Sequence, residues 1–167
     1  GHRSGALSRF LVSYSRLTRL APLQRREVAL GPLLEKVARL ESRMPVTLEA
    51  GPPPHLMADP DQLEQALINL VRNAAEASLP TRGGVVLRWQ AKAERVSIEI
   101  LDEGEGLPSS DSLFVPFFTT KAGGSGIGLV LSRQILEAQR GSLELLSRAP
   151  EAGTVAEIRL PLASPER

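Results

Sequence analysis

The sequence predicts an α+β fold, in which a mixed β-sheet carries helices on one face in a two-layer α/β sandwich. Two patterns lead to this prediction. Apolar residues recur at helical spacing between residues 60 and 74 and again between 126 and 139, whereas they alternate with polar residues over 85–89 and 96–100. Each helix then has one apolar stripe and each strand one apolar face, and stacking the two layers buries both.

The chain opens with a short segment and an isolated helix. Residues 1–5 resemble a tag remnant or an arbitrary cut end. Residues 6–20 place five apolar side chains at helical spacing: Leu7, Phe10, Leu11, Tyr14 and Leu17. Pro22 ends this amphipathic helix. Because a single helix of this kind must bury its stripe, we expect a partner chain or a segment outside this sequence to cover it.

A second helix and two short strands follow. Pro32 can open the helix. Its apolar face carries Leu33, Leu34, Val37 and Leu40. Residues 46–50 and 55–58 are strand candidates, and the proline-rich stretch 51–54 between them is a turn.

The helix after Asp59 has the clearest start signal in the chain. Asp59 is a favourable N-cap, Pro60 suits the first helical position, and Gln62 completes a capping box. Six apolar residues then share one stripe: Leu63, Ala66, Leu67, Leu70, Val71 and Ala74. At about 100° per residue, Asn73 lies at the edge of this stripe and Asn69 just beyond it, so both amides should border the core and a cleft.

Two hairpins and one more helix complete the domain. Apolar residues alternate at 85, 87 and 89 and at 96, 98 and 100, and Asp102 continues the second alternation on the same face. The helix 126–139 directs five side chains inward: Ile127, Val130, Leu131, Ile135 and Ala138. Gly141 is its expected C-cap, and a last hairpin pairs 142–148 with 154–160.

Composition excludes several classes of protein. The chain has 167 residues, of which 42% are hydrophobic, as expected for one domain with a short appendage. A formal net charge of +1 argues against nucleic-acid binding through a large positive field. The sequence has no cysteine, which excludes disulfides, thiolate zinc sites and a cysteine nucleophile. Without a long apolar run or a signal peptide, we expect no membrane contact by this chain.

Asp102 is the strongest candidate for a ligand-binding residue. A carboxylate at the end of an inward-facing row is costly to bury unless a hydrogen-bond donor reaches it. The amino group of adenine is such a donor, and Gly104 removes a side chain that would keep a flat base away. The motif Asp102-x-Gly104-x-Gly106 also fits an ordinary turn, but its place after an apolar strand and downstream of two asparagines favours nucleotide binding.

Asn73 is the candidate metal ligand. Its amide oxygen is a hard donor suited to a Mg²⁺ ion that keeps several waters and bridges phosphate oxygens. The alternative is a surface or capping asparagine. Two asparagines in mid-helix carry a propensity cost that this alternative leaves unexplained.

The glycine-rich segment 124–128 opens the helix 126–139 and can present N–H groups and a positive dipole end to phosphate. Taken alone, it fits a flexible turn equally well. Before it, three of the four phenylalanines fall between residues 113 and 121, in a loop that can close over a ligand. Lys121, at the end of this loop, can reach phosphate or be a solvated lysine.

In this order, the motifs resemble the ATP-binding catalytic domain of sensor histidine kinases, in the family that includes gyrase, the mismatch-repair ATPase and a chaperone ATPase. Residues 69–74, Asn-Leu-Val-Arg-Asn-Ala, are similar to the kinase asparagine motif, and Phe-Val-Pro-Phe at 114–117 is similar to the phenylalanine box. Gly153-Thr154 is similar to the family's last glycine-threonine pair, which also fits a structural role. Asn-Ala-Ala-Glu-Ala at 73–77 is most like the nitrogen-regulatory branch.

The resemblance implies a Bergerat-type sandwich over residues 28–163 that binds ATP and Mg²⁺. Asn73 would be the magnesium ligand and Asn69 its catalytic partner. Gyrase-type ATPases carry a water-activating glutamate at the position of Asn69, so an amide there implies phosphoryl transfer to a protein and not hydrolysis. The implied nucleotide contacts are Asn73, Asp102, Gly104, Gly106, Phe117, Thr120, Lys121, Gly124, Ser125, Gly126, Ile127, Gly128, Leu129 and Thr154.

One departure from the family concerns the asparagine helix. Many of these kinases carry a lysine and an aromatic residue where this chain has Glu76 and Ala77. We therefore expect neither a phosphate-binding lysine nor an aromatic base contact on this helix. Arg72 can replace the lysine charge or be a surface arginine.

The implied function is transfer of the γ-phosphoryl of Mg–ATP to a histidine on a separate helix hairpin. Residues 6–22 resemble the second helix of that dimerisation hairpin, and neither His2 nor His55 has the surroundings of a phosphoacceptor. The implied partners are this hairpin of the same protein, a response regulator reached through the parent kinase, and a second copy in a homodimer. The implied location is cytoplasmic, with membrane anchoring of the parent open. The alternatives are an anti-sigma-factor-type serine kinase and an ATP-sensing module without transfer.

Overall fold

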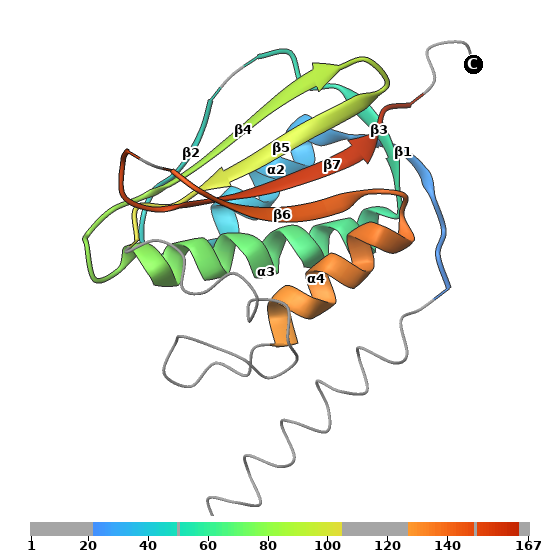
Figure 1. The fold of residues 1–167 in the computed structure, drawn as a ribbon. Helices are drawn as coiled ribbons and strands as arrows, with labels where there is room; N and C mark the ends of the chain where they lie inside the picture. Colours follow the sequence, from blue (N-terminus) through green and yellow to red (C-terminus); the bar gives the residue numbers. More distant parts are fainter. Residues whose placement is uncertain (1–21, 50, 105–126, 149, 164–167) are drawn as a thin grey trace, which may run out of the picture.

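The computed structural model describes residues 22–49, 51–104, 127–148 and 150–163 (Figure 1). Its elements in chain order are β1 (Arg26–Ala29), α2 (Leu30–Leu40), β2 (Val46–Leu48), β3 (His55–Ala58), α3 (Pro60–Ser78), β4 (Val85–Lys92), β5 (Arg95–Leu101), α4 (Ile127–Ala138), β6 (Ser142–Ser147) and β7 (Thr154–Pro161). The helix expected at 6–20 lies outside the described residues.

The main sheet has five strands in the order β2-β4-β5-β7-β6. The β2–β4 pair is parallel, and the other three pairs are antiparallel. Figure 1 shows α2, α3 and α4 on the same face of this sheet. The predicted α+β architecture, a mixed sheet covered by helices on one face, is therefore confirmed.

A second sheet of two strands was only half predicted. β3 was expected, but β1 was not, and the two strands pair antiparallel apart from the main sheet. A bridge between Leu56 and Leu162 joins this pair to the end of the main sheet. The four residues of β1 have no apolar alternation of their own, so only their partner makes them a strand.

The core lies between the sheet and the helices, and the alternation of the strands determines which side chains enter it. All six residues of the predicted α3 stripe are buried, as are Val85, Leu87, Val96, Ile98 and Ile100 of β4 and β5. Two predictions for the other helices are wrong. Leu40 is 58% exposed because α2 ends there, and Ala138 is exposed because the buried side of α4 runs through Ser132 and Leu136.

Asp59 caps α3 as predicted, but its own N–H has a partner that the sequence did not indicate. Its Oδ1 accepts from the N–H groups of Asp61 and Gln62 at 3.0 and 3.1 Å. Its N–H donates to Oε1 of Gln139, 2.7 Å away at the end of α4, where the capping box would have used Gln62. The N–H of Gln24 donates to Asp59 Oδ2 at 2.9 Å. Asp59 therefore connects the segment before β1 with α3 and α4.

The C-terminal end of α4 differs from the prediction in one detail. The left-handed residue is Arg140, with φ of 64°, whereas Gly141 was expected to be the cap. The N–H of Gly141 donates to the carbonyl of Leu136 at 2.8 Å, which completes a Schellman motif. Glycine is needed at 141 for a different reason, because a Cβ there would overlap the carbonyl oxygen of Arg159. Among the described helices, none is both long and apolar enough to span a membrane.

We predict that Asp59→Ala lowers the free energy of unfolding by about 2 kcal/mol, because it removes an N-cap and the link to Gln24. Urea denaturation measures this loss. Asp61→Ala is the matched control: this exposed carboxylate only interacts with the helix dipole, and its loss should cost about 0.5 kcal/mol or less. Equal losses for the two variants would mean that the cap does not hold α3 in place.

Candidate nucleotide-binding site

The candidate site is centred on Asp102, which follows β5 directly. The residue is only 8% exposed, as the alternation of the preceding strand predicts. Oδ1 accepts from the N–H of Gly104 at 2.9 Å and from the N–H of Thr154 at 3.1 Å. The N–H of Asp102 donates to the carbonyl of Thr154 at 2.9 Å. The structure thus brings together three of the predicted site residues, from two distant parts of the chain.

Gly104 makes room for α3. A Cβ at this position would lie 2.8 Å from the carbonyl oxygen of Ala77 and 2.9 Å from its Cβ. We expected this glycine to let a base approach. The structure shows that the C-terminal turn of α3 fills the space left by the missing side chain. The glycine therefore allows the Asp102 segment to pack directly against the helix.

Ser78 and Thr81 fasten the same segment to the end of α3, and sequence reasoning missed both. The N–H of Glu103 donates to Ser78 Oγ at 3.0 Å, and Thr81 Oγ1 donates to the carbonyl of Glu103 at 2.6 Å. Ser78 is fully buried. It lies four residues after Ala74, in the continuation of the apolar stripe, and a hydroxyl in that row was the available signal.

Asn69 and Asn73 lie where the periodicity places them. Both side chains are half-buried, at the edge of the α3 stripe. Ala77 is four residues after Asn73 and so lies on the same face of the helix. Because Gly104 packs against Ala77, the helix face that carries Asn69 and Asn73 ends next to the Asp102 segment.

The start of α4 carries the last of the predicted nucleotide contacts that the structure describes. The helix begins at Ile127 and packs against α3, and Figure 1 shows it running from below the middle of α3 towards the beginning of that helix. Its first N–H groups and positive dipole end therefore point back along the α4 axis, away from the beginning of α3. At Gly128 a Cβ would meet nothing within 4 Å, and Leu129 packs against the core.

The remaining predicted nucleotide contacts lie outside the described residues: Gly106, Phe117, Thr120, Lys121, Gly124, Ser125 and Gly126. For a metal ion, the described part of the chain contains no group of three or more His, Cys, Asp or Glu side chains. A Mg²⁺ ion held by one amide, phosphate oxygens and water fits this donor set, because Mg²⁺ rarely needs an all-protein cage. Asn73 is the residue that would hold it.

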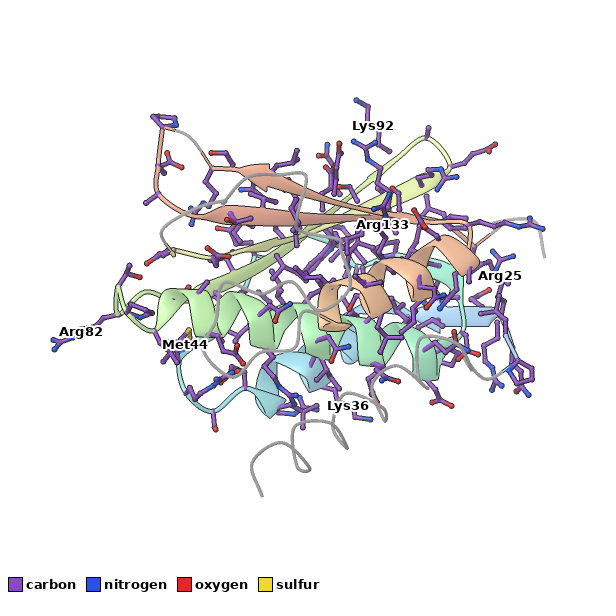
Figure 2. The ribbon with its side chains drawn as sticks, turned by 60° about the horizontal axis from the view of Figure 1, so that its bottom comes forward. Arg25, Lys36, Met44, Arg82, Lys92 and Arg133 are labelled. Carbon is purple, nitrogen blue, oxygen red and sulfur yellow. The ribbon has the colours of Figure 1, made fainter. Side chains whose placement is uncertain are left out.

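Arg72 faces away from this arrangement, towards α2. It lines a hollow of about 210 Å³ together with Val37, Leu40, Glu41, Ile68 and Val71. The pKa of Glu41 is lowered, mainly by a side-chain hydrogen bond from Arg43 and to a smaller extent by the charge of Arg72. Lys36 of α2 pairs with Glu64 of α3 at 2.7 Å, and Figure 2 shows Lys36 at the outer surface. The structure therefore associates Arg72 with Glu41.

Comparison with known proteins identifies the family. Residues 58–164, more than half of the chain, match the family described as histidine kinase-, DNA gyrase B- and HSP90-like ATPase. The chain belongs to this family.

The similar curated proteins are sensor kinases. The chain is 37% identical over 108 residues to the sensory histidine kinase/phosphatase NtrB of Klebsiella oxytoca, covering 56% of this chain and 30% of that protein. It is 38% identical over 133 residues to the C4-dicarboxylate transport sensor protein DctS of Rhodobacter capsulatus, covering 75% and 20%. The chain thus spans less than a third of the length of these relatives.

Solved structures show the same fold. The catalytic domain of the histidine kinase ThkA matches with a TM-score of 0.74 at 28% identity, covering 83% of this chain and 96% of that one. Full-length ShkA, solved in complex with AMPPNP, matches with a TM-score of 0.79 at 26% identity, covering 95% and 36%. The chain is therefore a histidine-kinase-type ATPase catalytic domain, as the motifs predicted, and these comparisons do not favour the serine-kinase or ATP-sensing alternatives.

Proposed function

We propose that this domain binds Mg–ATP between α3, Asp102 and the start of α4, and transfers the γ-phosphoryl group to a histidine on a separate helix hairpin. The observation that carries the proposal is the buried carboxylate of Asp102, fixed by the N–H groups of Gly104 and Thr154 beside the helix that bears the two asparagines. A family member solved with an ATP analogue, ShkA, supports it.

Asp102 would recognise the base. A buried carboxylate is stable only with donors around it, and two backbone N–H groups already hold its Oδ1 in one orientation. The exocyclic amine of adenine would add a further donor. Guanine presents a carbonyl oxygen at the corresponding position, which a carboxylate repels. The site therefore selects adenine by the sign of one hydrogen bond.

Asn73 would hold Mg²⁺ through its amide oxygen, and the ion would neutralise charge on the phosphates. The first N–H groups of α4 would contact the phosphates, where the helix dipole favours negative charge. Asn69, on the same helix as Asn73, is neutral and cannot take a proton from water, so it would position groups without activating a hydrolytic water. Phosphoryl transfer requires mainly such positioning and charge stabilisation.

The acceptor would be a nitrogen of a histidine outside this domain. The nitrogen lone pair forms the new P–N bond as the bond between the γ-phosphorus and the bridging oxygen breaks, and ADP leaves with that electron pair. His55, which pairs with Glu27 at 2.7 Å, is a poor acceptor because β3 leads into the beginning of α3, whereas the Asp102 segment is bonded to the end of that helix. The proposed partners are the histidine-bearing hairpin of the same protein, a response regulator and a second copy of the parent kinase in the cytoplasm, in keeping with the sensor kinases that the chain resembles.

Asp102→Asn should weaken ATP binding by about ten- to a hundredfold, because a charged acceptor contributes about 1.5–3 kcal/mol. Isothermal titration calorimetry with ATP and GTP measures both the affinity and the adenine preference, and both should fall. The amide keeps the size of the side chain, so the melting temperature of the variant controls for folding. Unchanged ATP affinity would remove Asp102 from the base site.

The Asn73→Ala variant distinguishes the contribution of metal binding from that of base binding to the affinity for ATP. The variant should lose the Mg²⁺-dependent tightening of ATP while adenosine binds almost as before, since the amide contacts the ion and not the ring. Titrations with ATP, with and without Mg²⁺, and with adenosine make the comparison. If ATP and adenosine weaken equally, the substitution has damaged α3 and the amide is not a metal ligand.

This chain alone should bind ATP without labelling itself, and the histidine-bearing hairpin of the parent kinase added in trans should accept phosphate weakly. Weak transfer is expected because unlinked parts lose effective concentration. Incubation with γ-labelled ATP, followed by acid treatment, measures it. Strong acid-labile label on this chain alone would contradict the absence of an acceptor, and rapid phosphate release without label would indicate a hydrolase.

A further inference from the structure

The peptide that follows Asp102 has a cation on its carbonyl oxygen. Nη1 of Arg148 donates to this oxygen at 2.6 Å, although the two residues are 46 positions apart. Arg148 follows β6 directly, at the start of the hairpin that leads to β7, and its side chain is half-buried. No motif in the sequence pointed to this arginine.

The hairpin between β6 and β7 is shaped to place Arg148 there. The N–H of Arg148 donates to the carbonyl of Gly153 at 3.1 Å, and its carbonyl accepts from Glu151 at 3.1 Å. Gly153 has φ of +119°, which favours glycine, and a Cβ at this residue would overlap the carbonyl oxygen of Asp102. The hairpin backbone therefore lies directly against the Asp102 peptide.

The 102–103 peptide is consequently held at both edges. Its oxygen accepts from Arg148, and its N–H, that of Glu103, donates to Ser78 Oγ. A peptide unit is planar, so these two contacts together fix its rotation. The Gly104 N–H that bonds Asp102 Oδ1 belongs to the next peptide, 103–104, whose carbonyl accepts from Thr81 Oγ1. Because the two peptides share Glu103, the rotation of the first restricts where the second can place this N–H, and through it the direction of the carboxylate.

We propose that Arg148 is a positioning residue for base recognition: by holding the 102–103 peptide, it keeps the Asp102 carboxylate directed at the adenine amine and so sets the preference for adenine over guanine. This inference rests on the proposed role of Asp102 in binding the base. Arg148 acts through Asp102 and does not itself need to touch the nucleotide.

The test compares Arg148→Met, which keeps most of the apolar stem and removes the donor, with Asp102→Asn and the double variant. Calorimetry with ATP and GTP should show ATP weakened by about three- to tenfold in Arg148→Met, with GTP nearly unchanged. In the Asp102→Asn background, the same arginine substitution should have almost no further effect, because coupled residues are not additive. Arg148→Lys, which keeps one donor, should restore part of the preference.

Arg159→Met is the matched control. Arg159 is an exposed arginine on β7 that pairs with Glu157 at 3.0 Å on the outer face of the sheet, so its loss should leave the ATP-to-GTP ratio unchanged. Melting temperatures are recorded for all variants. If Arg148→Met does not fold, Arg148→Lys against wild type carries the same comparison with a smaller expected change.

The outcomes are distinct. A lower ATP-to-GTP ratio that is lost in the double variant supports the inference. An unchanged ratio in Arg148→Met, or a loss of affinity that adds fully to that of Asp102→Asn, overturns it while leaving the base site in place. If Asp102→Asn itself binds ATP as tightly as wild type, the proposed base site is wrong, and so is the proposed role of Arg148.

Discussion

The position of α3 is the constraint on which the rest of this structure depends. Its apolar stripe must lie in the core, and this leaves its asparagine edge at the border of the site. Burial alone would let the helix slide or turn, because apolar contacts are not directional. Hydrogen bonds at its two ends remove that freedom. Asp59 fixes the beginning, and Ser78 with Thr81 fixes the end.

The two ends have different consequences for the site. At the beginning of α3, Gln139 connects Asp59 to the end of α4. This contact fixes one end of α4 relative to α3 and so restricts where the start of α4 can lie. At the end of α3, the 102–104 segment is bonded to the helix itself. The elements that carry the proposed base, metal and phosphate contacts are thus all attached to α3, which keeps them in fixed positions relative to one another.

Two glycines near Asp102 allow other parts of the protein to pack closely against it. Gly104 allows the strand end to approach α3, and Gly153 allows the β6–β7 hairpin to approach Asp102. Motifs of this type resemble ligand-binding loops because both uses need a residue without a side chain. At these two positions the close approach of neighbouring parts of the chain supports the Asp102 carboxylate.

The sequence by itself determined the elements whose signal is local: the cap and stripe of α3, the alternation of β4 and β5, and the inward direction of Asp102. It also indicated the family through motif order. Only the tertiary structure decided that β1 is a strand, that Gln139 meets Asp59, and that Arg148 lies on the Asp102 carbonyl. Periodicity reports which face of an element is buried, because that depends on neighbours one turn or two residues away. Contacts between residues 46 or 80 positions apart depend on how the layers pack, and no local pattern encodes them.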